Sequence, residues 1–133
     1  IYIERQISIK FEDSKTGQDQ MKAAMQKLRA DPFNEIEGKL VIKVDDYLTS
    51  KSLDLATGVN QDITLPVSDV LVYWLKNGTK IMVRPSGTEP KVKVYVGVIL
   101  EDYETIPQGE AAAEKNANEI LEAMKELLTN VNT

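Results

Sequence analysis

The residues best suited to chemistry lie in one short stretch, Arg84-Pro85-Ser86-Gly87-Thr88-Glu89-Pro90-Lys91. It offers a guanidinium, two hydroxyls, an ammonium and several backbone N–H groups, so hydrogen-bond donors outnumber acceptors. Such a donor set suits an oxyanion such as phosphate. Gly87 would let the backbone approach a ligand closely and turn through positive φ, and successive N–H groups could then form a concave anion site. Ordinary solvated turns use the same residue types, so composition alone leaves that alternative open.

The prolines and the glutamate of this stretch have supporting roles. Pro85 and Pro90 lack an N–H donor and fix φ, which keeps the loop out of the sheet ladder. A rigid loop has a lower ordering cost when it binds a ligand. Because a carboxylate repels phosphate, we expect Glu89 to accept hydrogen bonds from loop N–H groups or to pair with Lys91.

Two β-rich runs must position the loop. Residues 69–76 and 79–84 are joined by Asn77-Gly78, which predicts a hairpin with a type I′ turn. That turn should lie at one end of the sheet, with the loop alone at the other. After the loop, four alternating residues predict a buried strand face: Val92, Val94, Val96 and Val98. Lys93 then points to the opposite face, either toward a phosphate or simply toward solvent.

The first third of the chain predicts a strand and a helix. Apolar residues alternate over residues 1–11, the period of a half-buried strand. Thr16 or Asp13 could cap the following helix, which should end at Asp31-Pro32. Its apolar stripe consists of Met21, Ala24, Met25 and Leu28.

The rest of the chain predicts one more strand and a final helix. Leu40, Ile42 and Val44 should share a strand face, and residues 46–66 read as an exposed loop or short hairpin. Pro107 suits the first turn of the last helix. Its apolar stripe consists of Ala113, Ala117, Ile120, Leu121, Met124 and Leu128. Four strands and two helices without βαβ repetition predict an α+β fold: a mainly antiparallel four-stranded sheet with both helices on one face.

Length and composition limit the possible functions. A chain of 133 residues with 42% hydrophobic and 28% charged residues predicts a single domain, 1–133, with no membrane-spanning segment. Histidine and cysteine are absent, which excludes zinc sites and Ser-His or Cys-His nucleophiles; a cysteine-free chain fits the cytoplasm. A net charge of −5 argues against nucleic acid as a partner. Asp45 and Asp46 should point to opposite strand faces, so we expect no metal site there.

The string RPSGTEP followed by KVKVYV resembles the C-terminal phosphate-binding loop of the α-D-phosphohexomutases, the phosphoglucomutase and phosphomannomutase family. The Asn-Gly hairpin before the loop, the segment Asp46-Tyr47-Leu48-Thr49 and the final amphipathic helix extend the similarity over nearly the whole chain. The resemblance implies that this chain, which starts at Ile1, is the C-terminal (fourth) domain of a longer enzyme. It also implies a TATA-binding-protein-like fold.

Enzymes of this family interconvert hexose 1- and 6-phosphates through a bisphosphate intermediate, and the resemblance implies that the loop holds the distal, non-reacting phosphate. Carried over by position, the phosphate-binding residues are Arg84, Ser86, Gly87, Thr88 and Lys93. The supporting residues are Pro85, Glu89, Pro90 and Lys91. The family's serine nucleophile motif and magnesium loop do not occur in this sequence. We therefore expect this segment alone to be inactive, with no catalytic or metal-binding residue of its own, and Mg²⁺ to be bound by another domain.

The implied partners are a hexose phosphate, either glucose or mannose 1-/6-phosphate, and the other domains of the same enzyme. Two alternatives stay open: a stand-alone module that binds phosphorylated ligands, and a structural or interaction domain without a ligand. The sequence leaves the choice between glucose and mannose undecided, as well as the oligomeric state and the role of residues 46–66.

Overall fold

A computed structural model describes residues 1–129 and shows an antiparallel sheet with two helices, which confirms the α+β prediction. The helices are α1 (Lys15–Ala30) and α2 (Ile106–Thr129). The strands are β1 (Tyr2–Lys10), β2 (Glu35–Ile36), β3 (Lys39–Asp46), β4 (Lys51–Asp54), β5 (Asn60–Asp62), β6 (Leu71–Leu75), β7 (Lys80–Pro85) and β8 (Lys91–Ile99). The sheet therefore has eight strands rather than the predicted four, a number that was already one short of the five strand-like runs described above. The last four residues of the predicted domain, 130–133, lie outside the described part.

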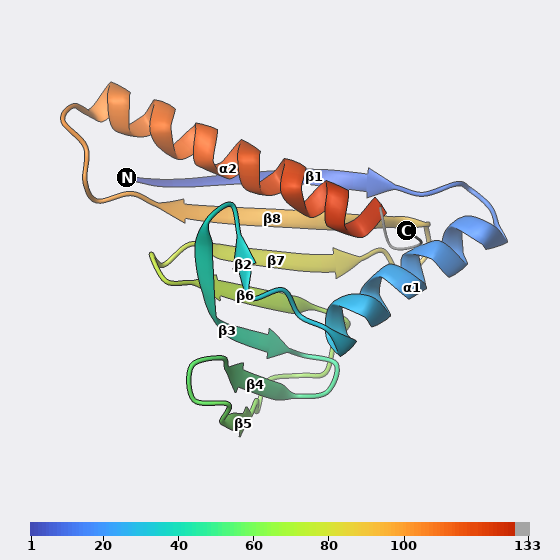
Figure 1. Ribbon diagram of the computed structural model, residues 1–133. Coiled ribbons are helices and arrows are strands. Elements are labelled where there is room, and N and C mark those ends of the chain that lie inside the picture. Colours follow the sequence, from blue (N-terminus) through green and yellow to red (C-terminus); the bar gives the residue numbers. More distant parts are fainter. Residues whose placement is uncertain (130–133) are drawn as a thin grey trace.

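The strands lie in the order β1-β8-β7-β6-β3-β4-β5, and β2 pairs with β3 off this path (Figure 1). The strands that the sequence did not predict are the short ones. Within residues 46–66, β4 and β5 pair as a hairpin, which is the second of the two predicted alternatives. Their few residues are mostly polar, so no alternation of apolar side chains marked them as strands.

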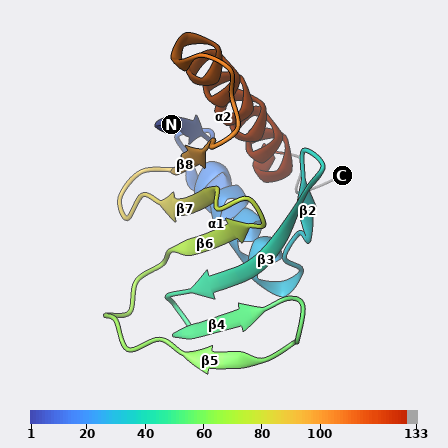
Figure 2. The same cartoon turned by 90° about the vertical axis from the view of Figure 1, so that its left-hand side faces the viewer.

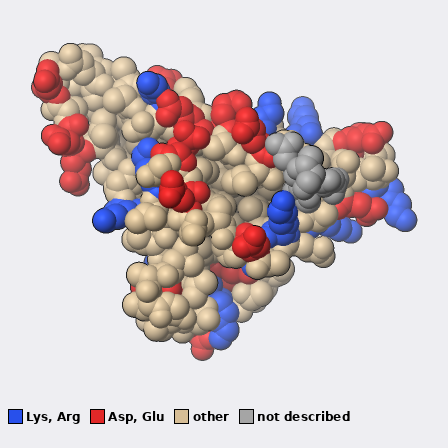
Figure 3. Space-filling model, in the orientation of Figure 1, with Lys and Arg blue, Asp and Glu red and all other residues tan. Residues whose placement is uncertain are grey.

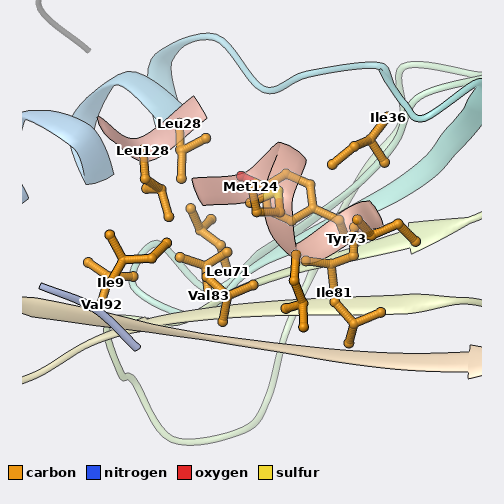
Figure 4. Packing of buried hydrophobic residues seen from close by; sticks show 14 of the residues in the cluster. Ile9, Leu28, Ile36, Leu71, Tyr73, Ile81, Val83, Val92, Met124 and Leu128 are labelled. Carbon is orange, nitrogen blue, oxygen red and sulfur yellow. The ribbon is translucent and has the colours of Figure 1, made fainter. Parts of the chain in front are cut away.

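Both helices cover the same face of the sheet (Figures 1 and 2). The predicted stripes of α1 and α2 are buried there, as are all four valines of β8. Figure 4 shows how Met124 and Leu128 of α2 and Leu28 of α1 pack against residues of the sheet. Tyr73 of β6 is fully buried in this core and stacks on Phe33, with ring centroids 4.3 Å apart. The other sheet face carries no helix, and we call it the open face.

Helix α1 begins between the two predicted starts. Its N-cap is Ser14, whose side chain accepts a hydrogen bond from the Gly17 N–H at 3.2 Å. Neither Thr16 nor Asp13 fills this role. Gly17 lies inside the first turn, where a Cβ atom would stand 1.6 Å from the backbone oxygen of Glu12. The glycine therefore permits a close approach of the chain at the start of the helix.

Strand β3 has a bulge that the sequence pattern concealed. Its pairing with β6 shifts between Val41 and Lys43. The extra residue reverses the alternation of side chains. As a result Leu40 and Ile42 are 52% and 42% exposed, whereas Val41 and Val44 are buried. The prediction that Leu40, Ile42 and Val44 share one buried face was therefore wrong.

The turn between β6 and β7 is also not the predicted type I′ turn. That type needs positive φ at both central residues, but here only Gly78 has it, at 90°. The Gly78 N–H donates to the Leu75 carbonyl at 3.0 Å, as in three-residue hairpin loops that end in a left-handed glycine. Asn77 contributes its side chain instead, because its Oδ1 accepts a hydrogen bond from the Thr79 N–H at 3.0 Å.

Charge is unevenly spread over the helix-bearing side of the molecule. Figure 3 shows acidic side chains gathered along α2 on this side. They include the exposed residues Glu110, Glu114, Glu119, Glu122 and Glu126. Within residues 1–129, neither helix combines the length and apolar character that a bilayer crossing requires.

Candidate functional site

Two cations stand side by side next to the loop. Arg84, near the end of β7, pairs in register with Lys93 of β8. The neighbouring pair, Val83 and Val94, is buried on the helix side, so Arg84 and Lys93 point to the open face. Neither cation forms an ion pair with another of residues 1–129. They are therefore available to an anion.

Hydrogen bonds to Ser86 shape the loop itself. The Ser86 N–H donates to the Lys91 carbonyl at 2.8 Å, which closes the loop. The Ser86 Oγ accepts from the N–H groups of Thr88 at 3.4 Å and Glu89 at 3.1 Å. Since a hydroxyl also carries one donor, the Ser86 O–H remains able to donate to a ligand. Serine thus holds the loop as well as offering a donor, a role that the sequence had left to the prolines.

The acidic residue of the loop, Glu89, forms an ion pair with its neighbour Lys91. A Glu89 carboxylate oxygen lies 3.5 Å from the Lys91 ammonium, which is the pairing that the sequence suggested. The Glu89 N–H donates its hydrogen bond to the Ser86 Oγ, as described above. This ion pair partly neutralises Lys91, whose side chain is 26% exposed. Lys91 is therefore better suited to supporting the loop than to serving as its main cation.

Gly87 differs from the sequence prediction. Positive φ occurs at Gly38, Gly58 and Gly78 but not at Gly87. A Cβ atom added at Gly87 would also have no neighbouring atom within 4 Å. Neither the fold of the loop nor its packing requires glycine here. Because Gly87 has no side chain, a ligand from solvent can approach the backbone of the loop.

The loop does not stand alone at its end of the sheet. The Phe11 N–H, just past β1, donates to the Pro90 carbonyl at 2.7 Å. In the register of β1 with β8, Ser8 lies opposite Lys93 and Lys10 opposite Lys91. The alternation over residues 1–11 predicts that one side of this strand is polar. It could not show that this strand pairs with the strand after the loop.

The comparisons with known proteins bear on the same elements. Residues 7–105 match the family model described as phosphoglucomutase/phosphomannomutase, C-terminal domain. The chain belongs to this family. The phosphoglucomutase of Staphylococcus aureus (strain bovine RF122 / ET3-1) is 37% identical over 92 residues, which cover 69% of this chain and 16% of the relative. That of Staphylococcus haemolyticus (strain JCSC1435) is 37% identical over 107 residues, which cover 80% and 19% respectively.

The phosphohexomutase domain described here thus spans less than a fifth of the length of these relatives. Among solved structures, it is similar to the open form of the exocytosis-sensitive phosphoprotein pp63/parafusin, a phosphoglucomutase from Paramecium. That similarity has a TM-score of 0.46 at 14% sequence identity, and it covers 98% of this chain and 20% of that chain.

A hollow of about 520 Å³ lies on the open face of this phosphohexomutase domain, away from the loop. Lys80, Tyr95 and Gly97 line it. Lys80 and Gly97 lie at the ends of β7 and β8 that are far from the loop, whereas Tyr95 lies two residues from Lys93 on the same face of β8. Tyr2 crosses Gly97 and donates a hydrogen bond to Glu4 at 2.6 Å, which raises the pKa of the tyrosine. Glu4 and Arg5 also line the hollow, so it combines one acidic residue with two basic ones. In the loop, by contrast, the carboxylate of Glu89 is already paired with Lys91.

The family implies magnesium in the whole enzyme, and the adjacent carboxylates of β3, Asp45 and Asp46, are the candidate ligands in this chain. Both are engaged with other side chains. Asp45 accepts hydrogen bonds from Ser52 and from the Trp74 indole, the latter at 2.9 Å. Asp46 accepts from Arg29 Nε at 3.2 Å with both oxygens. No group of three metal-ligating side chains occurs in the part of the chain that the structure describes. These residues do not fit a magnesium site.

Proposed function

We propose that the loop Arg84–Lys91 binds the distal phosphate of a hexose phosphate, the one that does not react, within a longer phosphohexomutase. The observation that carries this proposal is the pair of cations, Arg84 and Lys93, which lie opposite each other beside the loop without carboxylate partners among residues 1–129. A planar guanidinium beside an ammonium suits a doubly charged oxyanion.

The remaining contacts come from the loop. Ser86 and Thr88 offer hydroxyl donors, and Gly87 offers a backbone N–H on the exposed side of the loop. Pro85, Glu89, Pro90 and Lys91 hold the loop in shape. A hydrogen bond to a charged group contributes about 1.5–3 kcal/mol. We therefore expect loss of the Arg84 guanidinium to weaken phosphate binding more than loss of any other single side chain.

Holding a remote phosphate assists the chemistry through orientation. The reacting oxygen is elsewhere on the sugar, so contacts to the distal phosphate act by positioning and by binding energy realised in the transition state. When the bisphosphate turns end for end, the same loop can receive the other phosphate. One anion site therefore serves both half-reactions of an enzyme that interconverts hexose 1- and 6-phosphates.

We further propose that the serine nucleophile and the magnesium ligands are supplied by other domains, and that this chain alone is inactive. Its isolated loop would offer a few solvent-screened contacts against an association cost of about 4–15 kcal/mol. We expect its affinity for phosphate to be about millimolar or weaker. A cytoplasmic location stays a prediction, as does the choice between glucose and mannose.

The test in the longer enzyme is Arg84→Ala. We expect a higher KM for the sugar phosphate and a lower kcat, with kcat/KM reduced at least about tenfold, since a poorly held bisphosphate misorients or escapes. Arg5→Ala is the matched control, because Arg5 is a partly exposed arginine paired with Glu114 of α2 on the helix side. If kcat/KM of the Arg84→Ala enzyme equals that of the control, the assignment is wrong.

The same question can be asked of this chain by NMR titration with glucose 1-phosphate. Amide shifts confined to residues 84–91 that saturate only at millimolar ligand support the proposal. Tight binding by the chain alone would favour a stand-alone binding module instead. The absence of shifts in the loop would favour a structural or interaction domain.

A further inference from the structure

The end of β1 brings a second chain segment to the anion site. We propose that Lys10 is a further phosphate-binding residue, so that the site is built from β1 as well as from the β7–β8 loop. This inference rests on the proposed function and extends it. The ligand class is the same, a phosphate monoester, and what is added is a cation that lies 74 positions before Arg84 in the sequence.

The strand register places Lys10 beside the loop. Lys10 lies directly opposite Lys91, the last residue of the loop, and Ser8 lies opposite Lys93. Lys93 in turn lies opposite Arg84 on the other side of β8. Neighbouring strands are about 4.8 Å apart. Residues two apart on a strand share a face, so Ser8 and Lys10 point to the open face, as do Lys93 and Arg84.

A hydrogen bond fixes the end of β1 to the loop. The Phe11 N–H donates to the carbonyl of Pro90, the last residue before β8, at 2.7 Å. The residue that follows Lys10 is therefore tied to the loop backbone itself. This contact fixes the backbone of Lys10 beside the loop, and the long, exposed side chain of Lys10 can extend from there toward a bound anion.

The local charge balance favours an anion at this point. Lys10, Arg84 and Lys93 form no ion pair with any of residues 1–129, whereas Lys91 has Glu89. Three cations thus gather at one corner of a chain whose net charge is −5. Like charges close together repel one another, and a doubly charged phosphate between them relieves that repulsion.

The experiment is an NMR titration of the 133-residue chain with glucose 1-phosphate at low salt, followed through the loop amides. We expect Lys10→Gln to weaken binding about three- to fivefold, the upper part of the range of an exposed charge pair. Lys22→Gln, which removes the same charge from the exposed side of α1, should change the dissociation constant by less than about 1.5-fold. Lys10→Arg should bind about as well as the unmodified chain, because it keeps the cation.

Each outcome decides between the two proposals. If Lys10→Gln matches Lys22→Gln while Arg84→Gln weakens binding tenfold or more, the inference about Lys10 is wrong and the loop assignment stands. If Arg84→Gln leaves binding unchanged, the loop assignment is wrong and the inference falls with it. Unchanged protection of the Phe11 amide from hydrogen exchange in the free Lys10→Gln variant would show that the end of β1 still holds the loop. Loss of that protection together with unrestored binding in Lys10→Arg would reassign the effect to structure and overturn the inference.

Discussion

Strand β7 has a connection at each end, and the two are built for different purposes. The turn to β6 is tight and packed against the protein: Gly78 has a φ of 90°, and Thr79 is fully buried. The loop to β8 is open: Gly87 has no positive φ, and no atom would meet its Cβ. Both connections contain a glycine, yet only the glycine of the turn is demanded by the backbone.

The comparison shows how to distinguish a structural glycine from a functional one. At Gly78 a side chain would strain the turn, and it would lie 3.4 Å from the Cδ1 of Ile99. At Gly87 the fold would tolerate a side chain, so its absence needs another reason. In our proposal that reason is the approach of a phosphate to the loop N–H groups. Three substitutions test the difference between the turn and the loop. They follow in the order of the expected size of their effect on the free energy of unfolding.

Gly78→Ala should have the largest effect on stability. A non-glycine residue in the left-handed region costs about 1–2 kcal/mol, so the free energy of unfolding should fall by that amount. Urea denaturation of the variant and of the unmodified chain measures the difference. The affinity for glucose 1-phosphate should be unchanged, since the turn lies at the far end of β7. A stability loss below about 0.5 kcal/mol would mean that the turn readily adopts another conformation.

Thr79→Val should act in the opposite direction at the same turn. The buried Thr79 hydroxyl has no hydrogen-bond partner among residues 1–129, and a buried unsatisfied polar group costs about 1–3 kcal/mol. We expect valine to raise the free energy of unfolding by about 1 kcal/mol, measured by urea denaturation. Thr88→Val is the matched control, because Thr88 is exposed in the loop and its hydroxyl reaches solvent. Destabilisation by Thr79→Val would indicate a partner for the hydroxyl.

Gly87→Ala should have the smallest effect on stability. Since the backbone and the surrounding space both accept a Cβ, the free energy of unfolding should change by less than about 0.5 kcal/mol. Phosphate affinity should nevertheless fall several-fold, because the methyl group obstructs the approach to the loop N–H groups. NMR titration with glucose 1-phosphate measures this. Equal affinity for Gly87→Ala and the unmodified chain would remove the functional explanation of this glycine.

The predictable parts of the fold are those whose pattern is repeated many times. The valines of β8 alternate without interruption, and the stripe of α2 extends from Ala113 to Leu128, so one irregular residue could not hide either element. Strand β3 shows the opposite case. One inserted residue near Ile42 reversed its pattern, and a bulge leaves no consistent mark in the sequence.

The loop residues could be named from the sequence because they are contiguous. The sequence could not show which residues of other strands lie next to the loop, because this depends on how the strands pair. That Ser8 and Lys10 lie beside Lys93 and Lys91 depends on which strands pair, and alternation within one strand carries no information about its partner. The hydrogen bonds to Ser86 and the φ of Gly87 likewise depend on the three-dimensional course of the loop.

The pairing of the first strand with the last has a consequence for how the protein folds. Tyr2 pairs with Ile99, and the backbone nitrogen of Ile1 donates to the Leu100 carbonyl at 2.9 Å. During synthesis β1 leaves the ribosome before β8 and has no partner until β8 follows. Closing so long a stretch of chain is entropically costly and slows folding. We therefore expect the corner that contains Lys10 and the loop to form late, after the hairpin of β6 and β7.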